Sequence, residues 1–121
     1  MTVRIRAPGD DGILGLVYSE DEVTEEDLTR QRRMLAEAMV REDCNRVLVD
    51  ITRLKYLPSM AAMIDHNSAI TLNSNLLNAR FAVLCKSIDA EHQFLEDTGV
   101  NRGVQMKCFT ERAEAVAWLK K

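Results

Sequence analysis

Two short apolar runs in the middle of the chain constrain its fold more than any other feature. Residues 47–51 read Val-Leu-Val-Asp-Ile, and residues 81–85 read Phe-Ala-Val-Leu-Cys. A strand with one face in water alternates apolar and polar residues, whereas these runs barely alternate. Strands of this kind are covered on both faces, as are the central strands of a parallel sheet flanked by helices. We therefore expect the two runs to lie side by side and parallel, with helices on both sides of the sheet.

Strand and helix signals alternate along the rest of the chain, with short connections. The turn-forming segment Pro8–Gly12 separates the first two strands and predicts a hairpin. Further strands are expected at residues 3–7, 13–18 and 104–108, and helices from Thr24, from about Met60, over 90–98 and after Thr110. This order predicts an α/β fold with a single five-stranded, mostly parallel sheet, an N-terminal hairpin and about four flanking helices. Residues 1–121 are expected to form one domain, because domains most often have about 100–150 residues.

Local signals predict how individual helices begin and end. Thr24 and Asp27 have the spacing of a capping box, in which each side chain binds the other residue's backbone N–H. Gly99 is expected to be the left-handed residue after the helix over 90–98. Thr110 is expected to cap the last helix. The apolar stripes are expected at Leu28, Leu35, Ala38 and Met39, at Met60, Met63, Ile64, Asn67 and Ile70, and at Ala113, Val116, Ala117 and Leu119.

Composition and charge exclude several classes of protein. With 46% hydrophobic and 29% charged residues, the chain is neither disordered nor collagen-like. The net charge of −3, without a basic stripe, argues against nucleic-acid binding. No apolar run approaches the ~20 residues that a transmembrane helix needs, and no secretory signal is evident, so we expect a cytoplasmic protein.

The cysteines and histidines indicate neither a metal site nor a cofactor. Cys44, Cys85 and Cys108 form no C-x-x-C pair, and the latter two close predicted strands, where cysteine usually acts as a small buried apolar residue. His66 and His92 are expected on different helices.

A catalytic dyad built from Cys85 and His92 with Asp89 is conceivable, but no motif accompanies these residues. We therefore expect a protein that is not an enzyme.

The segment Val47–Ala62 resembles the core segment of STAS domains, the family of bacterial anti-sigma-factor antagonists. In that family an apolar strand leads through a loop with a leucine and an aromatic–aliphatic pair to hydroxyl residues at a helix start, and Leu54, Tyr56, Leu57 and Ser59 match this arrangement. The ending, residues 109–119, is also similar to STAS-like domains and to an uncharacterised bacterial branch related to CRAL-TRIO lipid carriers. The resemblance implies a STAS-like fold and a regulatory domain that binds a protein partner.

The chain departs from the family at the phosphorylation site. Pro58 stands at the acidic position, Met60 where the phosphorylated hydroxyl would lie, and Ala61 in place of glycine. Ser59 is left as a weak candidate phosphosite, and its simpler role is to cap the helix that follows. We therefore expect a regulatory domain without the standard phosphoswitch.

Partners and ligands of an open α/β sheet gather outside the carboxyl ends of its strands. There the candidate contact residues are Tyr56, Ser59, Met60 and Lys86. An alternative function is a carrier of a small apolar, lipid-like ligand, with a pocket under the helix that begins near Met60, lined by Met60, Met63 and Ile64. Trp118 covers the sheet edge or anchors a partner chain, so a homodimer is left open.

Overall fold

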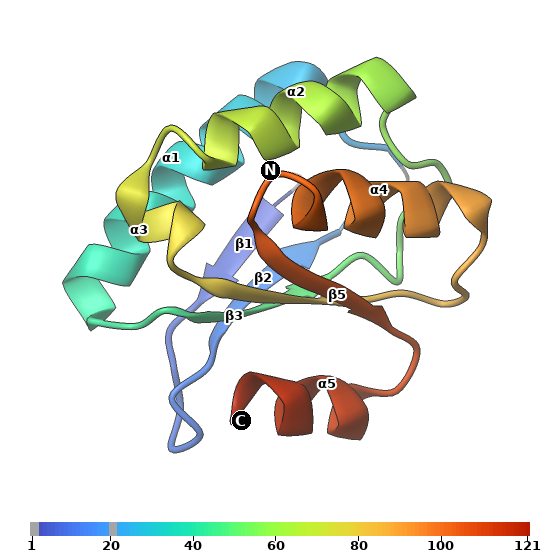
Figure 1. Cartoon of the computed structure of the whole chain (residues 1–121). Helices are drawn as coiled ribbons and strands as arrows, with labels where there is room; N and C mark the ends of the chain where they lie inside the picture. The colour runs from blue at the N-terminus through green and yellow to red at the C-terminus, as the bar shows by residue number, and fades with distance from the viewer. Residues whose placement is uncertain (1–2, 20–21) are drawn as a thin grey trace.

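The computed structural model describes residues 3–19 and 22–121, and its centre is a five-stranded sheet (Figure 1). The strands follow one another across the sheet in the order β1-β2-β3-β4-β5. The first pair is antiparallel and the other three pairs are parallel, so the predicted hairpin and mostly parallel sheet are confirmed. The strands are β1 (Val3–Arg6), β2 (Leu14–Tyr18), β3 (Arg46–Asp50), β4 (Arg80–Leu84) and β5 (Gln105–Phe109).

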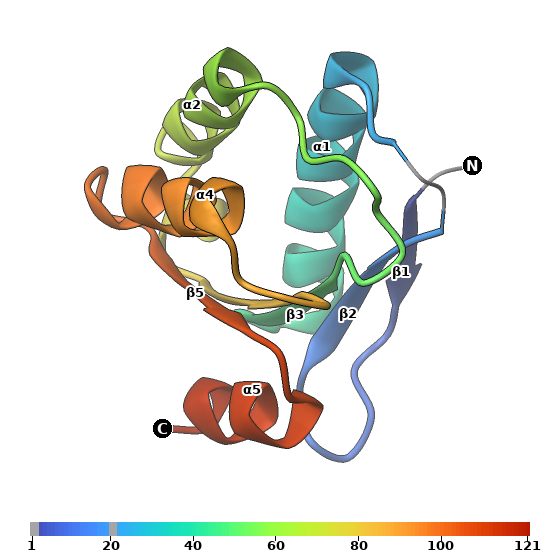
Figure 2. The ribbon, with the colours of Figure 1, turned by 90° about the vertical axis from the view of Figure 1, so that its right-hand side faces the viewer.

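Helices cover both faces of this sheet, but unequally. Figures 1 and 2 show α1, α2 and α4 on one side of the sheet and α5 on the other, and Figure 1 shows α3 on the same side as α1. The helices are α1 (Glu25–Glu42), α2 (Met60–Ile70), α3 (Ser74–Leu77), α4 (Ala90–Val100) and α5 (Arg112–Leu119). The short α3 was not predicted, because it lies in an asparagine-rich stretch with a weak helix signal. Asn73 begins α3 by accepting the backbone N–H groups of Asn75 and Leu76.

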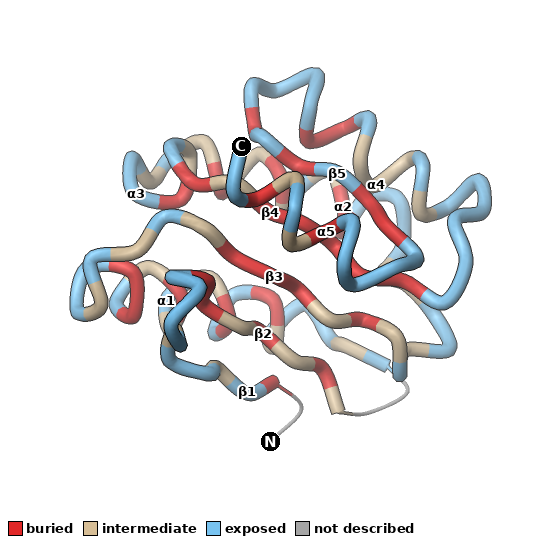
Figure 3. Tube along the Cα trace, turned by 90° about the horizontal axis from the view of Figure 1, so that it is seen from below, coloured by how far each residue is buried: buried red, intermediate tan, exposed pale blue. Residues whose placement is uncertain are grey.

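The two apolar runs pair as the sequence predicts. β3 and β4 are parallel neighbours, with Val47 opposite Phe81 and Val49 opposite Val83. All four side chains are buried, and the tube in Figure 3 is red over the central parts of both strands. Burial on both faces is therefore the reason that these runs contain so little polar alternation.

Two separate apolar clusters result, one on each face of the sheet. The larger lies between the sheet and helices α1–α4 and includes Leu16, Leu35 and Phe81. The smaller lies under α5 and consists of Ile13, Leu48, Ala82, Leu84, Phe109, Ala115 and Leu119.

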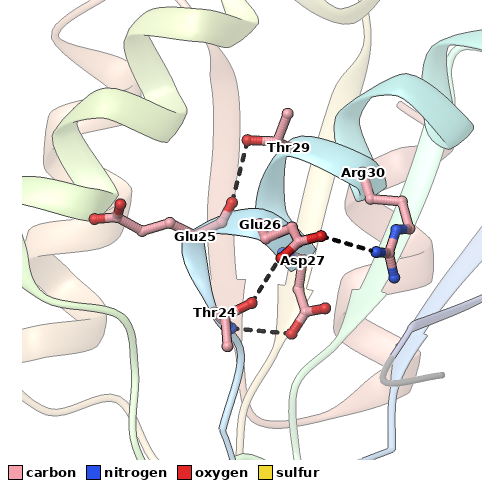
Figure 4. Close-up of polar contacts among 6 residues, drawn as sticks. All are labelled: Thr24, Glu25, Glu26, Asp27, Thr29 and Arg30. Atoms are coloured by element: carbon pink, nitrogen blue, oxygen red, sulfur yellow. Dashed lines mark hydrogen bonds and ion pairs between the residues drawn. The ribbon is translucent and has the colours of Figure 1, made fainter.

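The start of α1 has the predicted capping box (Figure 4). The Thr24 hydroxyl accepts the Asp27 backbone N–H at 3.0 Å, and the Asp27 carboxylate accepts the Thr24 backbone N–H at 3.0 Å. One turn further on, Glu26 pairs with Arg30 on the exposed side. This cap fixes where α1 begins and hence which side chains point at the sheet.

The prediction for the end of α4 is wrong. Gly99 lies inside the helix, which continues to Val100, and the left-handed residue is Gly103 with φ of 86°. Gly99 is needed for close packing instead, because a Cβ atom there would lie 3.2 Å from the Met106 Sδ. Its small size lets α4 approach both β5 and Asn67 of α2.

The predictions for α5 are also wrong in detail. The N-cap residue is Glu111, not Thr110, and its side chain makes no capping hydrogen bond. Ala113 and Ala117 are exposed, so the predicted stripe is rotated. The buried residues are Ala115 and Leu119, beside the half-buried Val116 and Trp118.

Packing of Trp118 explains the rotation of α5. The indole ring lies 5.8 Å from the Phe109 ring, and the Arg80 guanidinium lies 5.6 Å from the indole centroid. Arg80 also donates to the Trp118 carbonyl at 3.0 Å. The aromatic side of α5 therefore faces the sheet.

Among residues 3–19 and 22–121, none of the helices has both the length and the apolar character that crossing a bilayer requires.

Candidate functional site

The predicted contact residues lie along one edge of the sheet, beyond the carboxyl ends of β3 and β4. β3 ends because the Asp50 carboxylate accepts both the backbone N–H and the hydroxyl of Thr52, at 3.0 and 2.7 Å. The chain then runs through an irregular loop, residues 51–59, to the start of α2. β4 ends at the same edge and is followed by the exposed Lys86.

Large apolar side chains are exposed along this edge. Tyr56 is 64% exposed, Met60 is 58% exposed, and Ile88 is 42% exposed. Met60 therefore does not line the interior as predicted, because it is the first residue of α2 and lies beyond the edge of the sheet. Its companion Met63, one turn further on, is buried as predicted.

Ser59 caps α2. Its hydroxyl oxygen accepts the backbone N–H of Ala62 at 3.1 Å, and its side chain lies at the surface. The simpler of the two predicted roles is thus confirmed, and modification of Ser59 stays a prediction.

A small cavity lies on the other side of α2, between α1, α2 and the sheet. Its volume is about 60 Å³. The predicted lining is only partly right, since Met63 contributes but Met60 and Ile64 do not. The walls are mostly apolar and include Leu35, Val49, Ile51, Leu54, Leu57, Met63, Ile70, Phe81, Val83, Leu95 and Met106.

Among the described residues, the polar side chains that line this cavity form two pairs and are Tyr18, Gln31, Arg32 and His66. In the first, the Tyr18 hydroxyl donates to the Gln31 Oε1 at 2.8 Å. Both side chains are buried, and burial raises the pKa of the Tyr18 phenol, so this hydroxyl stays protonated and keeps donating to Gln31.

The second pair joins α1 to α2. Arg32 Nη1 lies 2.7 Å from His66 Nδ1. A guanidinium can only donate, so His66 accepts at Nδ1 and carries its proton on Nε2. Burial, and then the positive charge of Arg32, lower the pKa of His66 to about 4. Burial also lowers the pKa of Arg32, whose guanidinium still remains charged.

These polar residues were missed by the sequence analysis, although a signal was present. Gln31 and Arg32 fall between Leu28 and Leu35, in the middle of the apolar stripe of α1. His66 and Asn67 fall in the same way between Met63 and Ile70 of α2. A polar pair inside each of two apolar stripes indicates that the helices bury polar groups against each other or against a ligand.

Asn67 is used to hold α2 on α4. Its amide donates to the Leu95 carbonyl at 3.1 Å and to the Thr98 hydroxyl at 2.7 Å. Asn67 therefore belongs to the packing of the two helices, whereas His66 next to it faces the cavity.

Two of the three residues of the conceivable catalytic site, Asp89 and His92, are in contact. Asp89 accepts from the His92 backbone N–H at 3.0 Å and lies 2.6 Å from the ring Nδ1. The backbone and side-chain hydrogen bonds from His92 lower the pKa of Asp89. The buried Cys85 thiol instead donates to the carbonyl of Val83 at 3.6 Å.

The fold places the chain among α/β proteins with a mixed five-stranded sheet, an N-terminal antiparallel hairpin and helices on both faces. A structure of the same kind is the NMR structure of the protein TM1081, which is 13% identical in sequence. The similarity covers 97% of this chain and 87% of that one, with a TM-score of 0.61. No protein-family model matches the chain, and no curated protein sequence is similar to it. The likeness to TM1081 is therefore one of fold.

Proposed function

We propose that this protein is a non-catalytic regulatory or protein-interaction domain similar to the anti-sigma-factor antagonists. Its contact surface is the loop after β3 together with the start of α2. The observation that carries this proposal is the exposure of Tyr56 and Met60 at the sheet edge where partners of α/β sheets gather. Tyrosine and methionine are enriched at protein interfaces, and exposed lysine is depleted there, which places Lys86 at the rim.

The same surface supports regulation without the standard phosphoswitch. Pro58 and Met60 replace the acidic and hydroxyl residues of the STAS pattern. The only hydroxyl of that pattern that is kept, Ser59, accepts the first-turn N–H of Ala62. Binding at this surface is thus expected to depend on apolar contact more than on an added charge.

Site-specific photo-crosslinking in the native host tests the proposal. A photoreactive amino acid at Tyr56 is expected to capture a specific protein, and Met60→Glu is expected to abolish the crosslink. The same amino acid at Glu37, exposed on the outer side of α1, is the matched control. If position 37 yields the same products as position 56, or if neither yields any, the interaction function is wrong.

A second candidate is the carriage of a small apolar ligand, favoured by the cavity between α1 and α2. Its lining is largely aliphatic, and the flexible Met63 side chain can adapt its conformation to an occupant. The volume of about 60 Å³ is well below the ~150 Å³ of an engineered cavity that takes up benzene. The ligand must therefore be small, or the walls must move to admit a lipid chain.

Native mass spectrometry of protein purified under mild conditions tests this second candidate. A bound small molecule that is displaced by short aliphatic compounds supports it. A protein that carries none, and that binds none when they are added, contradicts it.

A further inference from the structure

A row of long polar side chains crosses the edge of the sheet at which β3, β4 and β5 begin. Arg46 is paired with Arg80, and Arg80 with Gln105, in the register of the three strands. Leu48 and Ala82, two residues further along β3 and β4, belong to the cluster under α5. Side chains two residues apart in a strand share a face, so the row lies on the α5 face of the sheet.

The pairing of Arg46 with Arg80 is electrostatically unfavourable. Neighbouring strands lie about 4.8 Å apart, and like charges directly opposite each other destabilise a sheet. Both side chains are half-buried, so water screens their repulsion less than it would at a fully exposed site. Over residues 3–19 and 22–121, neither guanidinium forms an ion pair with a carboxylate. An anion placed between the two arginines would therefore relieve this repulsion.

The end of α5 brings a third positive charge to the row. The Trp118 carbonyl accepts from the Arg80 guanidinium at 3.0 Å and from the backbone N–H of Lys121 at 3.3 Å. Lys121 is therefore held beside Arg80, at the same edge of the sheet.

These residues surround a groove of about 260 Å³. Its lining consists of Asn45, Arg46, Asn78, Arg80, Gln105 and Lys121. Three of these described residues are cationic, three carry side-chain amides, and none is an aspartate or glutamate. Cationic and amide N–H groups are donors to the oxygens of an anion. The volume exceeds the ~150 Å³ of a cavity that takes up benzene, so a phosphate group and part of the molecule attached to it can enter.

The number of positive charges favours a phosphate monoester among the possible anions. A phosphate monoester carries a charge of about −1.5 to −2 at neutral pH and offers three strong acceptor oxygens. A carboxylate or a phosphodiester carries a single negative charge and balances three cations less well. A strand of nucleic acid is disfavoured by the net charge of −3 of the whole chain.

We propose that the groove where β3, β4 and β5 begin binds the phosphate group of a small phosphate monoester, held by Arg46, Arg80 and Lys121. A guanidinium has five N–H donors, so Arg80 can donate to the phosphate while it keeps its bond to the Trp118 carbonyl. The groove lies at the opposite edge of the sheet from Tyr56 and Met60. The proposal is therefore independent of both functions proposed above.

Titration of the ¹⁵N-labelled protein with methyl phosphate at pH 8 and constant ionic strength, followed by NMR, tests the proposal. The second pKa of a phosphate monoester is about 6, so the ligand is a dianion under these conditions. Saturable shifts are expected for the backbone amides of residues 45–46, 78–80, 105 and 121. Dimethyl phosphate, which carries one negative charge, is expected to bind about fivefold or more weakly. Inorganic phosphate is expected to bind no more tightly than methyl phosphate.

Two pairs of charge variants locate the site. Arg46→Gln is expected to weaken methyl phosphate binding about tenfold, because hydrogen bonds between charged groups are the strong ones. Arg41→Gln, on the exposed side of α1 and outside the groove, is expected to leave the affinity unchanged. Lys121→Gln is expected to weaken binding about threefold and Lys120→Gln to leave it unchanged. Lys120 and Lys121 are adjacent and both exposed, so this second comparison remains available if Arg46→Gln does not fold.

Thermal melts give a second measurement. Without a ligand, Arg46→Gln is expected to have a higher Tm than the wild type, because the substitution removes the repulsion with Arg80. Methyl phosphate is expected to raise the Tm of the wild type more than that of the variant. A merely structural role of Arg46 would not produce these two opposite differences.

Three results would overturn the proposal. Equal affinities for methyl phosphate and dimethyl phosphate, or equal losses in the groove variants and their controls, would mean that the protein attracts anions through its surface charge in general. A preference of tenfold or more for inorganic phosphate would make the free ion the ligand instead of a monoester. No saturable shift at millimolar methyl phosphate would mean that the groove binds no phosphate group.

Discussion

The two faces of the sheet are built differently. Under α5 the cluster is entirely apolar. Under α1–α4 lie the cavity, the two polar pairs and, within the described ranges, all three buried polar residues, Gln31, Asn67 and Thr98. Burying polar groups lowers stability unless they are satisfied, so the α1–α4 face gives up some stability that the α5 face retains. The difference teaches that one face mainly holds the fold together while the other has room for binding in its interior.

The largest expected effect on stability is on the face of the sheet that α5 covers. Leu119 is fully buried under α5, so Leu119→Ala leaves a cavity and is expected to lower the free energy of unfolding by about 2–5 kcal/mol. Urea denaturation followed by circular dichroism measures it. Ala117→Ser, on the exposed side of the same helix, is expected to change it by less than about 0.5 kcal/mol. Equal values for the two variants would mean that α5 packs loosely, and the contrast between the faces would vanish.

Lowering the pH is expected to destabilise the protein through His66, which lies on the face covered by α1–α4. Its pKa is about 4 in the folded protein and 6.5 when unperturbed, so between these values the unfolded chain binds the proton and the folded one does not. Stability contributed by the neutral ring is thus complete above pH 6.5 and is lost as pH falls towards 4. The loss amounts to roughly 3 kcal/mol at most.

His66→Gln tests this pH dependence, because glutamine accepts from Arg32 but does not titrate. The wild-type and variant stabilities are expected to converge as pH falls from 6.5 to 4, while groups common to both, such as Asp89, cancel in the difference. His92→Gln controls for the loss of a histidine outside the cavity. Parallel stability curves for wild type and His66→Gln across this range would show that His66 is not buried as a neutral group.

Enlarging a buried side chain is expected to affect the free energy of unfolding differently on the two faces, by a smaller amount. Ala82 and Val83 are adjacent on β4, but Ala82 packs under α5 and Val83 lines the cavity. Ala82→Val is expected to overpack the cluster under α5 and to lower the free energy of unfolding by about 1–3 kcal/mol. Val83→Ile adds one carbon next to empty space and is expected to change the free energy of unfolding by less than about 1 kcal/mol in either direction.

Thermal melts of both β4 variants measure this difference. If Val83→Ile is as destabilising as Ala82→Val, the cavity wall is as tightly packed as the core under α5.

How much of this could be predicted from the sequence depends on whether the signal was local. The paired apolar runs and the Thr24–Asp27 cap are local patterns, and both were predicted correctly. Gly99 was misplaced because its small size serves contacts with Met106 and Asn67, which come from other elements. The rotation of α5 was missed for the same reason, since it depends on Trp118 meeting Phe109 and Arg80.

The candidate site was predictable to a smaller extent than the fold. The position of the exposed edge follows from a general rule for parallel sheets, so Tyr56, Ser59 and Lys86 could be chosen in advance. The lining of the cavity could not, because it depends on how far apart α1 and α2 pack. The adjacent polar residues Gln31 and Arg32 of α1, and His66 and Asn67 of α2, were visible in the sequence as interruptions of apolar stripes. Only the structure shows that Arg32 is hydrogen-bonded to His66.

The smallest expected effects concern how the helices on the two faces begin. α1 has a complete capping box at Thr24, whereas α5 begins at Glu111 without a side-chain cap. Thr24→Ala is therefore expected to lower the free energy of unfolding by about 1 kcal/mol. Glu111→Ser is expected to raise it by about 0.5–1 kcal/mol, because a serine there has Glu114 three residues later and completes the spacing of a capping box.

Urea denaturation of these two variants and of the double variant measures both changes. The sites lie on opposite faces of the sheet and share no partner, so the two effects are expected to add within about 0.5 kcal/mol. Thr24→Ala is also expected to speed hydrogen exchange in the first turns of α1, which carry Gln31 and Arg32 to the cavity, and Glu111→Ser is expected to leave that exchange unchanged. A double variant whose stability departs clearly from the sum would show that the two faces are coupled through the sheet, against the division of roles inferred from their packing.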